Sequence, residues 1–319
     1  MKIRFLSLAS GSSGNCYYLG TETYGILIDS GIGVRTIKKS LKDYGLALER
    51  VRAVFVTHDH ADHIKSVGTL GEKYGIPVYS TPEIHVGINK NYCMTEKLTS
   101  ASVRYIYKEV PIELDDFKIT AFEVPHDGTD NVGYCIEVGG KVFSFLTDLG
   151  EITPVAARYI CKANYLVIEA NYDEEMLKMG PYPQYLKERI ASANGHMSNR
   201  DTATFLAENM HEGLEYIWLC HLSKDNNHPD LALKTVEFIF RSKGILVGKD
   251  VKVTALKRIT PSEFHEFEKN SRNKNKKTAK DLQDKNKSLT FAPQLKKQAS
   301  LAQLVEQLTL NQWVQSSNL

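Results

Sequence analysis

Short apolar and β-branched runs recur along residues 1–260, separated by segments in which apolar positions repeat at helical spacing. Runs such as 51–56 and 216–220 are typical of buried strands. Residues 34–44 show helical spacing and end at Gly45, a residue common at helix C-caps. This alternation indicates an α/β fold in which helices cover sheets.

A cluster of three histidines and a carboxylate directly follows the apolar run 51–56, so it lies where a strand gives way to a loop. Imidazole and carboxylate groups suit zinc, iron and manganese. Four such groups exceed what one catalytic metal with an open position needs, and the segment therefore predicts a site for two metal ions. The four side chains are His58, His60, Asp62 and His63.

Further candidate ligands stand at the ends of other predicted strands. Each of them, taken alone, also has a purely structural interpretation, as a capping aspartate or a lone loop histidine. These residues are Asp29, His126, Asp148 and His221.

Taken in order, an Asp after an early strand, an HxHxDH motif, a downstream His, an Asp and a final His resemble the metallo-β-lactamase fold superfamily. The resemblance covers about residues 1–260 and implies a four-layer αββα sandwich with a binuclear site between the edges of two sheets. It also implies two divalent ions, zinc or manganese. The implied roles are one ion on His58, His60 and His126, the other on Asp62, His63 and His221, Asp148 as the bridge, and Asp29 orienting the ligand loop without touching metal.

A glycine- and serine-rich segment, residues 7–15, follows the predicted strand 3–6. Two glycines and several hydroxyl groups allow the backbone to approach an anionic group closely. An ordinary hairpin turn is an equally good interpretation. The substrate-binding candidates in this segment are Ser10, Ser12, Ser13 and Asn15.

His196 precedes a predicted helix that Ser198 or Asn199 could cap. In the transfer-RNA 3′-processing nucleases of the superfamily, a histidine at a matching place assists protonation of the leaving group. The resemblance thus makes His196 a candidate general acid, with a capping or solvated histidine as the alternative. Asp62 is a second catalytic candidate, because it could relay the proton of a water as well as bind metal.

Residues 9–15, 169–173 and 220–227 resemble the bacterial YycJ (WalJ) family, which implies a cytoplasmic metal-dependent nuclease with exonuclease action on DNA. The interval from Asp148 to His221 is too short for the inserted domain of the ribonuclease J type. No flexible arm for transfer RNA is evident either. DNA ends or other phosphodiesters are therefore the expected substrates, attacked by a metal-bridged hydroxide.

Two alternatives remain open. A hydrolase of the same fold that cleaves thioesters or lactams would not need His196 or the serine-rich segment. A non-catalytic metal-binding regulatory protein would not need any substrate site, although the complete ligand set argues against it. The sequence indicates no particular protein partner.

The composition indicates the size of the folded domain and the cellular compartment to expect. Its 319 residues, 42% of them hydrophobic, suffice for one large domain. Five scattered cysteines without a CxxC pair argue against a disulfide framework, and we expect a cytoplasmic location. Cys220, beside His221, should pack in the core because it points to the opposite face of its strand. No signal sequence and no run of about 18 apolar residues is present, so we expect neither secretion nor membrane spanning.

The composition changes near residue 268. Residues 268–297 contain ten basic and three acidic side chains, a net charge of +7. We expect a hydrolase domain over residues 1–267 and a disordered basic linker with a short amphipathic tail over 268–319. The linker could add salt-sensitive affinity for DNA, or it could simply be solvated.

Overall fold

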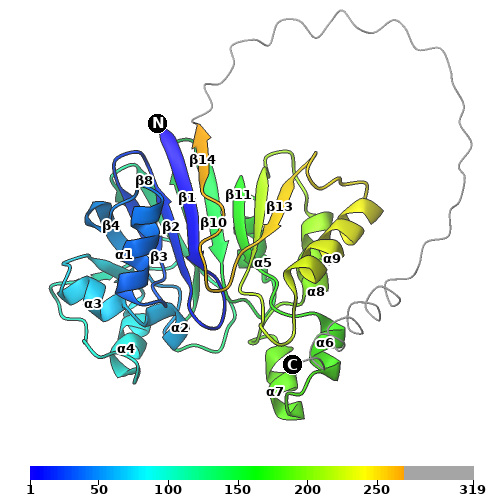
Figure 1. Ribbon diagram of the computed structural model, residues 1–319, viewed down its shortest axis with the longest axis horizontal. Helices are drawn as coiled ribbons and strands as arrows, with labels where there is room; N and C mark the ends of the chain where they lie inside the picture. Colours follow the sequence, from blue (N-terminus) through cyan, green and yellow to red (C-terminus); the bar gives the residue numbers. More distant parts are fainter. Residues whose placement is uncertain (269–319) are drawn as a thin grey trace, which may run out of the picture. The chain divides into compact units, whose positions relative to one another are not determined.

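The computed structural model describes residues 1–268, which form two sheets and the helices that cover them (Figure 1). The first sheet has the strand order β14-β1-β2-β3-β4-β5-β6, and the second has the order β13-β12-β11-β10-β9-β8-β7. The first comprises β1 (Lys2–Ala9), β2 (Cys16–Gly20), β3 (Gly25–Ile28), β4 (Val51–Phe55), β5 (Val78–Ser80), β6 (Val103–Tyr105) and β14 (His265–Glu268). The second comprises β7 (Ile112–Leu114), β8 (Phe117–Glu123), β9 (Val132–Val138), β10 (Lys141–Leu146), β11 (Tyr165–Glu169), β12 (Tyr216–Cys220) and β13 (Lys252–Ala255).

Each sheet is antiparallel on one side and parallel on the other. Strands β1 to β3 pair antiparallel and β3 to β6 pair parallel, while β7 to β10 pair antiparallel and β10 to β13 pair parallel. Parallel neighbours end at the same edge of a sheet, so the loops that follow them are collected there.

Helices cover the outer face of each sheet (Figure 1). Beside the first sheet lie α1 (Val34–Asp43), α2 (Ala61–Ile64), α3 (Val67–Glu72) and α4 (Pro82–Lys90), with the short 3₁₀ turn η1 (Leu48–Arg50) leading into β4. Beside the second lie α5 (Pro154–Ile160), α8 (Asn199–Glu208) and α9 (Pro229–Ser242). Two further helices, α6 (Glu174–Met179) and α7 (Gln184–Ile190), lie beyond the ends of the second sheet's strands.

Burial on both faces explains why the sequence of strand β12 is apolar throughout. Trp218 and Cys220 belong to the core between the two sheets, where the rings of Trp218 and Phe5 lie 4.3 Å apart. The intervening Ile217 and Leu219 pack in a second core against the covering helices. A strand buried on both faces reads as a continuous apolar run. The expected four-layer αββα sandwich is confirmed, and so is the placement of Cys220 in the core.

Local sequence signals account for the helix boundaries near the site. Helix α1 begins at Val34 and ends at Asp43, within the range predicted from apolar spacing. Helix α8 is capped by Ser198, whose hydroxyl accepts a hydrogen bond from the Asp201 N–H at 3.0 Å.

Within residues 1–268, no helix combines the length and the apolar character needed to cross a membrane. The predicted basic linker and tail, residues 268–319, lie outside the described residues except for Glu268, which ends β14.

Candidate metal centre

The predicted ligands come together where strands of both sheets end. The loop after β4 carries His58 and His60, and α2 adds Asp62 and His63. From the second sheet come His126, Asp148 and His221, which follow β8, β10 and β12. Ligand atoms lie within 4.8 Å of one another in four overlapping groups: His58 with His60 and His126, Asp62 with His63 and His221, His58 with His63 and Asp148, and Asp148 with Glu169, His196 and His221.

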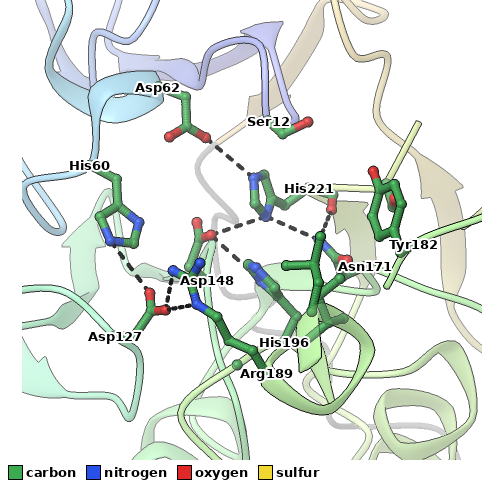
Figure 2. A pocket seen from close by; sticks show the side chains of 14 residues that line it. Ser12, His60, Asp62, Asp127, Asp148, Asn171, Tyr182, Arg189, His196 and His221 are labelled. Carbon is green, nitrogen blue, oxygen red and sulfur yellow. Dashed lines mark hydrogen bonds and ion pairs between the residues drawn. The ribbon is translucent and has the colours of Figure 1, made fainter. Parts of the chain in front are cut away.

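Two of these groups contain the residues that the resemblance assigned to each ion, and the assignment itself stays a prediction. Two groups supply three ligands each, and Asp148 shares a group with one histidine from either of them. Figure 2 shows the carboxylate of Asp148 centrally among the side chains that line the cavity. The seven residues that the resemblance named as ligands therefore lie close enough together to share bound cations.

Hydrogen bonding around the cluster fits divalent ions. Within the cluster, four buried atoms make no hydrogen bond to another described residue: Nε2 of His58, His126 and His221, and Oδ2 of Asp148. A buried polar atom without a partner costs about 1–3 kcal/mol, and a metal ion would use each of these lone pairs. Burial also lowers the pKa of His58 well below its usual range, which favours the neutral form that a ligand needs. At His63 and His221 burial is outweighed by nearby carboxylates, Asp148 first, which raise the pKa.

In two of the histidines, the ring nitrogen Nδ1, on the edge away from Nε2, is hydrogen-bonded to another group of the protein. Nδ1 of His126 donates to the carbonyl oxygen of Gly195 at 2.8 Å. Nδ1 of His63 donates to Asp29 Oδ2, also at 2.8 Å. Such bonds fix the tautomer in which Nε2 carries the lone pair, and this is the usual support for a metal-binding histidine.

Asp29 supports the ligand loop from beneath it. Its side chain is fully buried, and besides His63 it accepts hydrogen bonds from the Thr57 N–H and hydroxyl, each at 2.9 Å. Asp29 has a left-handed φ of 57°, and His221 has one of 52°, conformations that few residues other than glycine adopt. Strained backbone at two strand ends is typical of sites where side-chain direction matters.

Glu169, the last residue of β11, is a functional candidate that sequence reasoning did not assign. Its buried carboxylate accepts hydrogen bonds from Nδ1 of His196 at 2.7 Å and from Nδ1 of His221 at 2.9 Å. Burial raises the pKa of Glu169, but the charge of His196 and the bonds from both rings outweigh it, so the carboxylate stays ionised. The segment 169–173 contributed to the family resemblance, and a Glu closing an apolar strand was the signal for this role.

His196 lies just before α8 and lines the same cavity as the metal ligands (Figure 2). Burial lowers the pKa of His196, but the carboxylate of Glu169 outweighs burial and raises the pKa above its usual value. With Nδ1 bonded to Glu169, Nε2 remains for other contacts. The pair resembles other carboxylate-oriented histidines that move protons in catalysis.

Some residues of the serine-rich loop are buried and contact the predicted ligands, whereas others are exposed to solvent. The Ser10 hydroxyl accepts a hydrogen bond from the His221 N–H at 2.9 Å. Nδ2 of Asn15 lies 2.9 Å from Nε2 of His63 and 3.3 Å from Oδ2 of Asp62. Ser12 is exposed and lines the cavity, whereas Ser13 is exposed without lining it. Of the four candidates, Ser12 is thus the one whose position allows direct contact with a bound molecule.

The cavity in front of the cluster has a volume of about 300 Å³. Part of its wall comes from the candidate site residues His60, Asp62, Asp148, His196 and His221. A further part comes from α7 and the turn before it, through Tyr182, Leu186, Arg189 and Ile190. No motif in the sequence marked this wall, because α7 is a short polar helix of ordinary composition.

A family model described as a beta-lactamase superfamily domain matches residues 24–215. The chain is 34% identical over 253 residues to exodeoxyribonuclease YycJ of Bacillus anthracis, covering 78% of this chain and 93% of that protein. It is likewise 34% identical over 251 residues to exodeoxyribonuclease WalJ of Streptococcus pneumoniae, with the same two coverages of 78% and 93%.

Among solved structures, the metallo-beta-lactamase fold protein YhfI of Bacillus subtilis superposes with a TM-score of 0.60. The two sequences are 18% identical, and the match covers 83% of this chain and 100% of that one. At this identity the likeness supports the fold alone.

Proposed function

The chain belongs to the metallo-β-lactamase superfamily and, within it, to the YycJ/WalJ family, and from this premise we propose that it is a binuclear metal-dependent DNA exonuclease. One observation supports the proposal. Four of the seven predicted ligands, His60, Asp62, Asp148 and His221, line the same cavity as His196, whose ring is hydrogen-bonded to Glu169. Candidate groups for activating water and for protonating a leaving group thus face the same space.

Two divalent ions, zinc or manganese, would supply a water of lowered pKa, about 7, and would neutralise charge on the phosphoryl oxygens. The residues that would hold them are His58, His60, Asp62, His63, His126, Asp148 and His221.

The protein's own groups handle the protons. Asp62 is partly exposed to the cavity and can accept a proton from the attacking water. His196 gives the proton on Nε2 to the departing oxygen, and Glu169 keeps the ring oriented through Nδ1. Ser12, at the edge of the cavity, is placed to donate a hydrogen bond to a phosphate oxygen.

The first experiment compares two substrates, end-labelled double-stranded DNA and bis(p-nitrophenyl) phosphate, with protein loaded with manganese or zinc. We expect metal-dependent release of nucleotides from DNA ends by the wild type and none by Asp148→Ala. Asp43→Ala, which removes a surface carboxylate paired with Lys39, is the matched control and should cleave normally. Cleavage of the small diester alone would indicate a small-molecule phosphodiesterase. Cleavage of neither would refute the proposal in favour of acyl hydrolysis or a non-catalytic role.

His196→Ala separates proton donation from metal binding. His196 also stands in a group that could hold a metal, with Asp148, Glu169 and His221, but the resemblance assigns it no ion. The variant should therefore keep its metal content while losing DNA cleavage. Normal cleavage by this variant, with metal content confirmed by elemental analysis, would remove His196 from the mechanism.

A further inference from the structure

Helix α7 lies at the cavity for a reason other than core packing. None of its residues is buried, although Leu186, Arg189 and Ile190 line the same cavity as the predicted metal ligands. A helix that buries no side chain contributes little hydrophobic stabilisation to the fold. Its position is therefore better explained by what it presents to a bound molecule.

Arg189 is the charged residue of α7 that lines the cavity. Its Nε donates to Oδ2 of Asp127 at 2.7 Å, and a second guanidinium nitrogen contacts the same oxygen (Figure 2). Arg189 is 63% exposed, and such surface pairs add little to stability. The fold does not need this pair, so its placement at the cavity calls for a functional explanation.

The other oxygen of Asp127 faces the metal cluster. Oδ1 lies 3.4 Å from Nε2 of His60 and 3.4 Å from Nε2 of His126, the two atoms that would bind one of the ions. One carboxylate thus spans the space between a guanidinium group and a cation position. An anionic group of similar size, held by both partners, fits the same space.

Arg189 differs from the other permanently charged residues that line the cavity in the sign of its charge. Among the cavity's described lining residues, the permanent charges are the carboxylates of Asp62, Asp127 and Asp148 and the guanidinium of Arg189. A phosphate would be repelled by the carboxylates unless they are engaged by metal, whereas Arg189 attracts it in either case. The planar guanidinium also matches two phosphate oxygens at once.

We propose that Arg189 forms a phosphate-binding subsite and that Asp127 occupies this subsite until a nucleotide phosphate displaces it. The inference deepens the proposed nuclease function and rests on a phosphodiester substrate. On binding, Arg189 exchanges the carboxylate of Asp127 for a phosphate oxygen, and no covalent bond is made or broken. Tyr182, whose hydroxyl donates to Asp225 at 2.7 Å, is held at the same wall and provides a surface for the attached nucleoside.

The test is direct binding, measured calorimetrically, of deoxyadenosine 5′-monophosphate and of deoxyadenosine to the manganese-loaded protein. The wild type should bind the monophosphate more tightly than the nucleoside. Arg189→Ala should weaken monophosphate binding by about tenfold to a hundredfold and leave nucleoside binding unchanged. Arg189→Lys should recover part of the monophosphate affinity that Arg189→Ala loses, because lysine keeps the positive charge but lacks the planar guanidinium that contacts two phosphate oxygens. Asp127→Asn should strengthen monophosphate binding, because the competing carboxylate charge is gone.

Arg158→Ala is the matched control. Arg158 is an exposed arginine in α5 paired with Glu109 at 2.7 Å, and it does not line this cavity. It should bind both probes as the wild type does. Equal monophosphate affinity in Arg189→Ala and wild type would overturn the subsite, and so would a wild type that does not distinguish the two probes.

Kinetics on DNA separate this inference from the function on which it rests. If the wild type degrades DNA and Arg189→Ala shows the same KM and the same monophosphate affinity, the subsite is wrong and the nuclease proposal stands. If Arg189→Ala loses monophosphate affinity but the wild type cleaves no DNA, the subsite stands and the nuclease proposal is wrong.

Discussion

Replacing Asp29 with asparagine tests how strongly the metal centre depends on a carboxylate that is not itself a ligand. The substitution preserves side-chain size, and asparagine tolerates the left-handed φ of 57° found at this position. The backbone should therefore stay in place. What changes is the hydrogen bonding of one oxygen position.

No orientation of the new amide satisfies its neighbours. With the amide oxygen at the Oδ2 position, the NH₂ group faces the Thr57 N–H, which in the wild type reaches Oδ1 at 2.9 Å. With the amide reversed, NH₂ faces Nδ1 of His63, now 2.8 Å from Oδ2. Either way one buried donor is opposed by another, which costs about 1–3 kcal/mol.

The reversed orientation also affects the metal ion. His63 can relieve the clash by moving its proton from Nδ1 to Nε2, but that nitrogen then has no lone pair to give. We expect the zinc affinity of Asp29→Asn to fall by about 10- to 100-fold, the usual effect of losing a partner behind a ligand.

Competition with a chromophoric zinc chelator measures this affinity, with Asp43→Asn on the surface of α1 as the control. Urea unfolding of the metal-free proteins measures the cost of the opposed donor. A zinc dissociation constant for Asp29→Asn that equals the wild-type value would refute the reasoning, even if the metal-free variant were less stable.

Three other predictions follow from the structure. Glu169→Gln, assayed at saturating metal, should lower kcat for DNA by about 100-fold because His196 loses its orienting carboxylate, with little change in KM; an unchanged kcat would exclude the pair from proton transfer. Metal at 100 times its dissociation constant should stabilise the fold by about 2.7 kcal/mol per site, visible as a lower Tm after chelator treatment; an unchanged Tm would contradict the fit of the ions to the four unpartnered atoms. Trp218→Ala, at the centre of the core between the sheets, should cost about 3–5 kcal/mol in urea unfolding; a loss below that of a surface substitution would contradict the packing described.

The sequence predicted the fold class and gathered the ligand candidates because both depend on local patterns. His58, His60, Asp62 and His63 stand together in one loop, and the other candidates end apolar strands, a placement visible without coordinates. Parallel pairing then brings strand ends to one edge, as the structure shows for β10, β11 and β12.

Glu169, Arg189 and the role of Ser10 were not predictable in the same way. A strand-end Glu can point to solvent or to the site, and only the pairing of β11 between β10 and β12 places it beside His196. Arg189 belongs to a short surface helix whose sequence resembles that of any exposed helix. The Ser10 hydroxyl meets His221, a partner distant in sequence, so its contact depends on tertiary structure.

The division of the ligands between the two sheets has a consequence for how the protein is made. The first sheet and α2 contribute His58, His60, Asp62 and His63, which leave the ribosome early, while His221 follows β12, the next-to-last strand of the second sheet to be synthesised. A nascent chain can therefore complete neither the group of His58, His60 and His126 nor the group of Asp62, His63 and His221 until strands of the second sheet have docked. The site that the proposed function requires is thus completed late in synthesis, and a chain that ends before β12 lacks the group of Asp62, His63 and His221.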